Sequence, residues 1–180
     1  MLSRRTLIGS ALAATAAVQA NATQKPEPTA HTLFAFEARV TVATPQIVGQ
    51  SSRGLRRVVP ITGGTFEGPR IRGRVVPGGA DWQVVRPDGV LSVEAKYTLE
   101  ASDGALIMVT NRGMRHGPPD VIEKLTRGEA VDPSRYYFRT VAEFEVALES
   151  AHAWLNRAMF IGVAERLPGV CALERNLELV

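Results

Sequence analysis

The stretch PDGVLSVEAKYTLEASDG, residues 87–104, decides the fold of this chain. Its apolar residues occupy every second position, at Leu91, Val93, Ala95, Tyr97 and Leu99. Its polar residues occupy the positions between them, at Ser92, Glu94, Lys96, Thr98 and Glu100. Because successive side chains of a strand point to opposite faces, this alternation predicts a β-strand over 90–100 with one buried and one solvated face. The Asp-Gly pairs at 88–89 and 103–104 are typical of hairpin turns, so the flanking strands should run antiparallel to it.

The same pattern of short alternating runs, broken by Gly, Pro or Asp-Gly, extends from Leu33 onwards. It predicts further strands at 33–42, 56–62, 70–76, 80–86, 105–112, 136–146, 157–164 and 170–179. About nine strands at this spacing are typical of an antiparallel barrel or sandwich, and we favour the closed barrel. We therefore expect an all-β domain over 33–180, a single antiparallel β-barrel. The glycine pairs at 63–64 and 78–79 fall between or at the ends of these strands, where bulges and corners need residues without a Cβ atom.

Two segments depart from the strand pattern. Residues 113–135 are polar and rich in Pro and Gly, which predicts one long loop that can serve as a lid over a barrel mouth. Residues 141–155 also fit helical spacing, so one short helix there is an alternative to a strand.

The first 22 residues show the parts of a secretion signal. The pair Arg4-Arg5 is followed by an uncharged run over Thr6–Val18, and Ala20-Asn21-Ala22 offers small residues to a signal peptidase. The paired arginines indicate a signal of the twin-arginine type. Because Leu7 and Ile8 depart from that motif, the general secretory route remains an alternative. The uncharged run is also shorter than the roughly 20 residues that a membrane-spanning helix needs.

We therefore expect residues 1–22 to be a signal peptide that is cleaved after Ala22, followed by a flexible leader over 23–32. The mature protein would be exported, either periplasmic or secreted, with no stable membrane anchor. Removing 22 residues from 180 leaves 158, enough for one self-sufficient core. The net charge falls from +3 to +1, because Arg4 and Arg5 leave with the signal. No sustained basic patch remains, which argues against nucleic acid as a partner.

Cysteine and histidine content limits the chemistry. Cys171 is the single cysteine, so no intramolecular disulfide can form, and its apolar neighbours indicate a small buried residue rather than a nucleophile. The three histidines, His31, His116 and His152, do not have the spacing of a metal site. We also find no phosphate-binding loop, nucleophile elbow or metalloprotease helix, and so expect neither a metal nor a cofactor.

Asp81 and Trp82 follow a glycine pair, so the backbone bends just before it places an acid and a large aromatic on opposite sides of one strand. If Asp81 shares the barrel interior with Gln83, burial would raise its pKa towards working pH and make it a general base. If Trp82 faces inward instead, it forms a pocket wall or plain core, and Asp81 caps a turn.

Other candidate residues lie towards the ends of predicted strands, where a barrel exposes a pocket. Arg112 ends a row that runs from apolar to charged, and its planar donor fork can hold a carboxylate or an oxyanion. Tyr137 and Arg139 share one face and form a plausible acid or oxyanion-donor pair. Trp154 and Asn156 also share strand parity, and would add a stacking surface and a hydrogen-bonding amide. The alternatives are a solvated arginine at the start of a loop, an amphipathic strand with an exposed Arg139, and a core Trp154.

Four strings of the sequence resemble a known family. They are ITGGTFEGP at 61–69, PGGADWQ at 77–83, YFRT at 137–140 and WLN at 154–156. In this order the sequence is similar to domain-of-unknown-function family 3237 over about residues 33–180. The resemblance implies a small β-barrel. It implies no particular activity, because none is assigned to the family in general.

Two functions fit these residues. The first is a cofactor-independent enzyme of the lyase or isomerase type that acts on a small oxygenated molecule. In it, Asp81 abstracts a proton, Arg112 or Arg139 with Tyr137 stabilises the oxyanion, and Trp82 and Trp154 wall the pocket. The alternative is a non-catalytic carrier barrel, in which the arginines hold the acidic end of a small ligand. Whether the protein is an enzyme, and whether it forms a homo-oligomer, stays open at this level.

Overall fold

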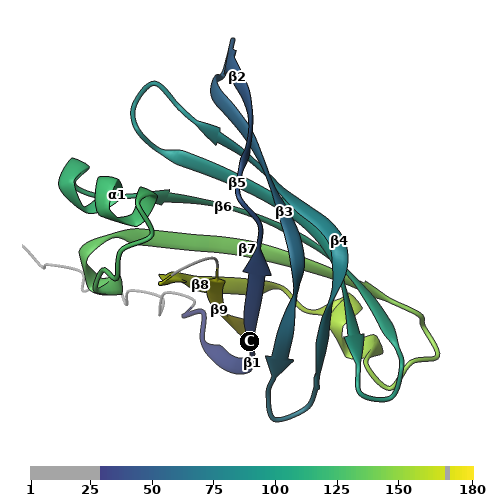
Figure 1. The fold of residues 1–180 in the computed structure, drawn as a ribbon. Helices are drawn as coiled ribbons and strands as arrows, with labels where there is room; N and C mark the ends of the chain where they lie inside the picture. The colour runs from purple at the N-terminus through teal and green to yellow at the C-terminus, as the bar shows by residue number, and fades with distance from the viewer. Residues whose placement is uncertain (1–28, 169–170) are drawn as a thin grey trace, which may run out of the picture.

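A computed structural model describes residues 29–168 and 171–180 as one β-barrel (Figure 1). The predicted signal peptide over 1–22 lies outside the described residues, as does the predicted leader as far as residue 28. The first strand begins at Thr32, at the end of that leader.

The described residues form nine strands, one α-helix and two short 3-10 helices. The strands are β1 (Thr32–Val42), β2 (Gln46–Ser51), β3 (Gly54–Glu67), β4 (Arg72–Val85), β5 (Leu91–Ala101), β6 (Leu106–His116), β7 (Tyr137–Val146), β8 (Phe160–Leu167) and β9 (Cys171–Leu179). The helices are α1 (Pro119–Thr126), η1 (Pro133–Arg135) and η2 (Ala153–Arg157). α1 lies at one end of the barrel and η2 at the other (Figure 1).

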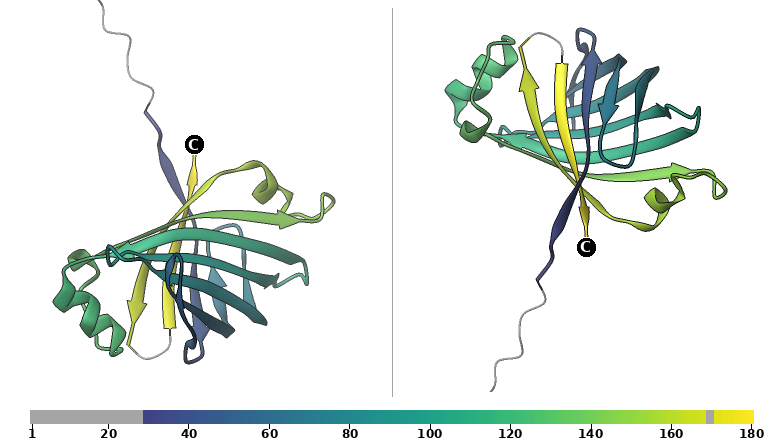
Figure 2. Two further views of the ribbon diagram at one scale, coloured as in Figure 1. Left: turned by 90° about the horizontal axis from the view of Figure 1, so that it is seen from above. Right: turned by 90° about the horizontal axis from the view of Figure 1, so that it is seen from below.

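The sheet closes on itself. Its strand order is β1-β9-β8-β7-β6-β5-β4-β3-β2, every pairing is antiparallel, and β1 also pairs with β3. In the described part of the chain, eight strands thus form the closed barrel, and β2 extends beside the first half of β3 (Figure 2). This confirms the predicted all-β antiparallel barrel. Closure removes the free sheet edges that would otherwise invite pairing with other chains.

The strands observed are not quite the strands predicted. The segments 70–76 and 80–86 form one strand, β4, whose register shifts between Val76 and Ala80. Gly78 lies in this shift with φ +114°, a conformation that residues with a Cβ atom rarely adopt. The glycine pair therefore bends a strand without ending it. β2, which the sequence analysis did not predict, has hardly any buried side chain to give it an alternating pattern.

The α-helix also does not lie within 141–155, where the helical spacing allowed one. Residues 137–146 form β7, and a 3-10 helix follows at 153–157. The single α-helix of the described residues, α1, lies inside 113–135, which we predicted to be one irregular loop. Pro119 suits a first helical turn, and Val121 and Leu125 are buried four residues apart on one face. This face packs on Leu91, Val93 and Phe138 of the barrel.

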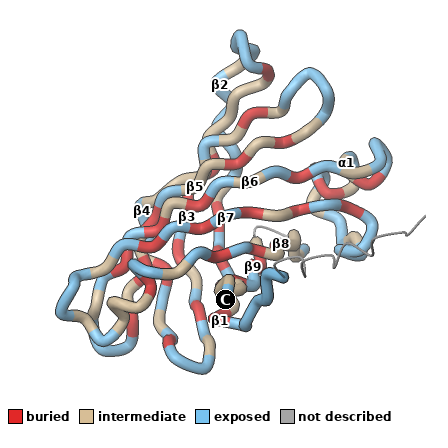
Figure 3. The backbone as a smooth tube through the Cα atoms, turned by 180° about the vertical axis from the view of Figure 1, so that it is seen from behind, coloured by how far each residue is buried: buried red, intermediate tan, exposed pale blue. Residues whose placement is uncertain are grey.

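The core fills the end of the barrel opposite α1. It contains Phe36, Phe66, Phe144 and Phe160, whose rings meet edge to face with centroids 4.9 to 5.6 Å apart. Leu155 of η2 is buried in the same cluster. Along the strands, buried and exposed positions alternate (Figure 3). The barrel is thus filled at one end, which leaves the end beside α1 for a cavity. No helix among the described residues is long and apolar enough to cross a membrane.

Candidate functional site

A cavity of about 250 Å³ opens at the end of the barrel beside α1. Its walls come from the barrel strands, from the β1–β2 connection and from Leu125–Gly128 at the end of α1. The charged and amide side chains among its lining residues are Arg57, Asp81, Gln83, Arg115, Arg127 and Arg166. The predicted lid segment therefore does border the mouth, as a helix end rather than as an irregular loop.

A second hollow of about 70 Å³ continues from this cavity towards the filled end of the barrel. The two share Val42, Asp81, Phe138 and Ala172 as walls. The deeper hollow is mostly apolar, and its polar lining residues are Asp81, Tyr97, Asn111, Thr140 and Glu174. Together the two spaces form one site with an arginine-rich mouth and an acidic inner end. Its size is at the lower end of the range for small-molecule sites.

Asp81 lies between the mouth and the inner hollow. In β4 it pairs with Val59 and Ala95, which line the same spaces. Its Oδ2 accepts a hydrogen bond of 2.5 Å from the Gln83 amide, and its Oδ1 accepts one of 3.0 Å from the backbone N–H of Glu94. Burial raises the pKa of Asp81, and these hydrogen bonds and the charges of Arg57 and Arg115 oppose the rise.

Glu174 is the second carboxyl group of the site, and it is buried on β9. Asn111 Nδ2 donates to both of its oxygens at 2.8 Å, and the Thr140 hydroxyl bonds to Oε1. Burial raises the pKa of Glu174 and the charge of Asp81 raises it further, whereas the two hydrogen bonds oppose the rise. No positive charge is among the causes of its pKa shift, which distinguishes it from Asp81.

Gly162 of β8 provides the space for the Glu174 carboxylate. A Cβ atom at this position would lie 2.0 Å from Thr140 Oγ1 and 2.1 Å from Glu174 Oε1. Any side chain there would therefore displace the hydrogen-bonded pair.

Three of the four arginines of the mouth come from three different strands, and the fourth, Arg127, follows α1. Arg57 of β3 donates from Nε to Gln83 at 2.7 Å, so Gln83 links Arg57 to Asp81. Arg115 of β6 is buried, and its guanidinium carbon is 5.8 Å from the centroid of the Phe138 ring. Burial, followed by the charges of Arg166 and Arg57, lowers the pKa of Arg115 to about 10. Arg115 still carries its charge at neutral pH.

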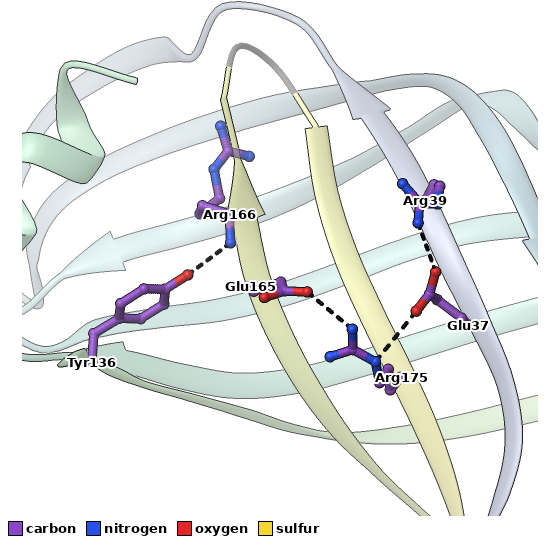
Figure 4. Close-up of polar contacts among 6 residues, drawn as sticks. All are labelled: Glu37, Arg39, Tyr136, Glu165, Arg166 and Arg175. Carbon is purple, nitrogen blue, oxygen red and sulfur yellow. Dashed lines mark hydrogen bonds and ion pairs between the residues drawn. The ribbon is translucent and has the colours of Figure 1, made fainter. Parts of the chain in front are cut away.

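The side chain of Arg166 completes the mouth. The phenol oxygen of Tyr136 accepts a hydrogen bond of 2.9 Å from the Arg166 backbone N–H, which ties β8 to the start of β7 (Figure 4). The Arg166 side chain lines the mouth, whereas its neighbour Glu165 pairs with Arg175 in a separate row of ion pairs (Figure 4).

Tyr97 of β5 supplies a hydroxyl to the inner hollow. Burial raises its pKa well above the usual value, and the charges of Glu174 and Asp81 raise it further. Tyr97 is therefore a neutral hydroxyl at any physiological pH and can donate a hydrogen bond to a ligand.

Of the residues predicted from sequence, Asp81 lies in this cavity and lines both of its parts. Trp82, its neighbour, is on the opposite face of β4 and is 40% exposed. Arg112 is on the outer face of β6, where it pairs with Glu94 at 3.3 Å. The row that ends at Arg112 is thus the outer row of β6, and the inner row is that of Val109, Asn111 and Arg115.

Tyr137 and Arg139 do share a face, as predicted, but it is not the face that lines the cavity. Tyr137 is exposed and stacks on His116, with ring centroids 4.9 Å apart. The Arg139 guanidinium carbon is 5.3 Å from the centroid of the Tyr137 ring, and its Nη1 donates to the Phe138 carbonyl at 2.9 Å. Arg139 lines a shallow hollow with Glu165 and Arg175, outside the cavity that contains Asp81.

Trp154 and Asn156 belong to η2, at the filled end of the barrel. The Trp154 ring packs on Phe160, and the guanidinium carbon of Arg70 lies 3.8 Å from its centroid. Asn156 exchanges two hydrogen bonds of 2.9 Å with the backbone of Val146. The structure therefore brings Asp81 together with none of the other six predicted site residues.

Sequence reasoning missed most of the residues that line the two parts of the cavity, and it missed the glycine that provides space for Glu174. The missed residues include Arg57, Tyr97, Asn111, Arg115, Thr140, Gly162, Arg166 and Glu174. One signal was available for Tyr97, because the alternation over 90–100 already placed it on the buried face. A weaker signal existed for Asn111, which follows Ile107 and Val109 at the same parity.

Within the described residues, no group of three or more His, Cys, Asp or Glu side chains is placed to hold a metal ion. What the site offers is two carboxyl groups with raised pKa values, a neutral phenol and several guanidinium groups around one small cavity. Such a set can move protons and bind oxygen anions.

Comparison with known proteins agrees with the resemblance noted in the sequence. Residues 30–175 match the family described as "Protein of unknown function (DUF3237)", and the chain belongs to this family. A UPF0311 protein of Rhodopseudomonas palustris is 41% identical over 139 residues, which cover 77% of this chain and 90% of that protein. Its crystal structure, of a conserved protein of unknown function, has a TM-score of 0.82 at 37% identity and covers 86% of this chain and 100% of that chain.

Two further proteins are informative. The crystal structure of a β-barrel-like protein of Acinetobacter baumannii has a TM-score of 0.74 at 37% identity, and covers 87% of this chain and 100% of that chain. A protein of Penicillium herquei named a hydroalkoxylation enzyme is 35% identical over 77 residues, which cover 43% of this chain and 51% of that protein. The first supports the fold, and the second names an activity within a related sequence.

Proposed function

We propose that this DUF3237 protein is an enzyme of the lyase or isomerase type, which adds an oxygen nucleophile to a carbon–carbon double bond of a small oxygenated molecule or catalyses the reverse elimination. One observation carries the proposal: Asp81 and Glu174, both with a raised pKa, line the same small cavity. When the surroundings of two carboxyl groups affect their pKa values differently, one group can act as the base and the other as the acid.

The surroundings of the two groups assign these roles. Asp81 is near Arg57 and Arg115 and accepts two hydrogen bonds, all of which favour its ionised form. For Glu174, burial and the charge of Asp81 raise the pKa, and no cation is among the causes that favour its ionised form, so its surroundings favour the protonated form. Asp81 is therefore the base and Glu174 the acid. The Thr140 hydroxyl can accept a hydrogen bond from a protonated Glu174 as readily as it can donate to an ionised one.

In the addition, the Asp81 carboxylate takes the proton of a substrate hydroxyl, and that oxygen forms a C–O bond to one carbon of the double bond. Glu174 gives its proton to the other carbon, so the π bond is replaced by one C–O and one C–H bond. Proton exchange with water then returns both carboxyl groups to their starting states. The elimination runs through the same steps in reverse.

The Penicillium herquei relative supports this reaction class, because hydroalkoxylation is the addition of an O–H group across a carbon–carbon double bond. That similarity covers less than half of this chain, so the site chemistry remains the main support.

The test compares Asp81→Asn and Glu174→Gln with the wild type on a panel of small hydroxylated alkenes, followed by mass spectrometry and by deuterium incorporation from D₂O at carbon. We expect both substitutions to lower turnover by about 10²-fold or more, the usual contribution of one acid or base. Turnover in the wild type should also fall at low pH as Asp81 is protonated, and at high pH as Glu174 ionises.

Glu100→Gln, on the outer face of β5, is the matched control and should retain full turnover. Unchanged turnover in Asp81→Asn and Glu174→Gln would refute the assignment of these groups. Ligand binding without any turnover in the wild type would instead support a carrier.

A further inference from the structure

We infer that the ligand of this cavity is a small organic carboxylate whose carboxylate group is bound at the mouth by Arg115, with Arg57 and Arg166 around it, and whose hydroxyl group donates to Asn111 at the inner end. The inference rests on the proposed function only in calling this ligand a substrate. The binding site itself would serve a carrier equally well.

Arg115 is the strongest indication of an anion. It is 7% exposed, and its Nε is fully buried without a hydrogen-bond partner among the residues that the structure describes. A buried guanidinium N–H without an acceptor is costly, so its place in a cavity wall points to an acceptor that the ligand brings. The contact of Arg115 with the Phe138 ring, at 5.8 Å, does not supply that acceptor.

The charges of the residues that line the mouth also point to an anionic ligand. Of the described residues that line the mouth, four are arginines and only Asp81 carries a carboxylate. Arg127 is already paired with Glu123 and Glu129 on the outer side of α1. Arg57 and Asp81 are linked through Gln83, so their charges offset each other. Arg115 is then a further, buried positive charge in the wall of this small cavity, and Arg166 lines the same mouth.

A carboxylate suits this arrangement better than other anions do. The planar guanidinium group presents parallel N–H donors at the spacing of two carboxylate oxygens. The cavity is also small, about 250 Å³, and its remaining walls include Val42, Leu91 and Phe138. These features fit a compact organic acid with an apolar body.

The inner end has its own unpaired group. Asn111 Oδ1 is buried and has no hydrogen-bond partner in the described part of the chain, while Nδ2 of the same amide is bonded to Glu174. A ligand hydroxyl in the inner hollow would donate a hydrogen bond to this Oδ1 and would lie beside Glu174 and Tyr97. Asn111 and Arg115 are four residues apart in β6, which separates their Cα atoms by about 13 Å. Because both side chains extend into the cavity, a ligand about one substituted ring long can reach both ends.

Isothermal titration calorimetry tests the inference with 4-hydroxybenzoate and 4-hydroxycinnamate, each compared with its primary amide. The amides keep the shape and the hydroxyl group but lack the charge. We expect the wild type to bind the acids at least about tenfold more tightly than the amides, as loss of a charge-assisted hydrogen bond predicts. Cinnamate, which lacks the hydroxyl group, should bind about tenfold more weakly than 4-hydroxycinnamate.

Arg115→Gln should reduce the preference for acid over amide to about twofold or less, because it removes the charge and leaves the binding of the amides almost unchanged. This selectivity is a readout that a purely structural role of Arg115 would not move. Arg74→Gln is the matched control, because Arg74 is exposed and pairs with Glu100 outside the barrel. If Arg115→Gln does not fold, Arg57→Gln and the wild-type comparison of acid with amide still decide the question.

Equal affinity of the wild type for acids and amides would overturn the inference, and so would the binding of neither. Selective binding of 4-nitrophenolate in place of the carboxylates would overturn the carboxylate assignment. If only the proposed function fails, the wild type would still bind the acids more tightly than the amides but would convert none of them.

Discussion

Gly162→Ala tests whether the space for the Glu174 carboxylate depends on the absence of a side chain in β8. The added methyl group would lie 2.0 Å from Thr140 Oγ1 and 2.1 Å from Glu174 Oε1. Real Cβ contacts are essentially never shorter than 3.0 Å, so each oxygen must retreat by close to 1 Å. Both atoms belong to buried residues in closed strands, so neither can move freely.

The expected cost follows from two effects. Overpacking a well-packed interior costs about 1–3 kcal/mol, and weakening a buried hydrogen bond to a carboxyl group costs about 1–3 kcal/mol more. Because the two effects overlap, we expect Gly162→Ala to lower the free energy of unfolding by about 3 kcal/mol. For a domain of this size that corresponds to a fall in Tm of about 6–12 °C.

The assay is thermal unfolding followed by calorimetry and by circular dichroism, at neutral pH. Gly117→Ala is the control, because its Cβ atom would lie 3.0 Å from the Tyr136 Cβ atom, a contact that needs a shift of only a few tenths of an ångström, so it should cost clearly less than Gly162→Ala. In a double variant, Thr140→Ala removes one of the two close contacts, so the two substitutions together should cost less than the sum of their separate effects. A Tm for Gly162→Ala within about 1 °C of the wild type would refute the reasoning.

Glu174→Gln should stabilise the fold relative to the wild type at high pH and not at low pH, as urea unfolding at a series of pH values will show. Folding raises the pKa of Glu174, so the group contributes its full stabilisation at pH values below its pKa in the unfolded chain. That contribution is lost as the pH rises through the pKa of Glu174 in the folded protein. Each tenfold difference in proton affinity contributes about 1.4 kcal/mol, and a difference between the proteins that is independent of pH would contradict the shift. The export prediction concerns residues 1–22, outside the described part of the chain, and we expect the mature protein to begin at Thr23. N-terminal sequencing of the protein from the periplasm or the medium checks this, and recovery of an intact N-terminus in the cytoplasm would count against it.

The placement of the candidate site shows where sequence reasoning was sufficient and where it was not. Asp81 was identified as a candidate because a carboxylate two residues after a glycine pair, with Gln83 at the same parity, is a local pattern. For β6 the local pattern was ambiguous, because both faces begin with apolar residues: Leu106 and Met108 on one, Ile107 and Val109 on the other. The first pair is exposed and the second is buried, so the interpretation that favoured Arg112 followed the outer face.

The sequence by itself determined the all-β antiparallel class, because alternation and turn chemistry are properties of a few neighbouring residues. Alternation set the strand faces where it was strict, as over 90–100, and the pairing of β1 with β3 in the structure decided closure into a barrel. The sequence also placed Tyr97 on the buried face, whereas the choice between Asp81 and Trp82 as the inward-facing residue of β4 came from the structure. Only the tertiary structure decided which groups meet in the interior. Glu174 stands in the sequence between Leu173 and Arg175 without any pattern to mark it, and becomes a buried partner of Asn111 and Thr140 only when the sheet closes. The reason is physical: burial, and with it the raised pKa, comes from strands distant in the sequence, so no local window contains it.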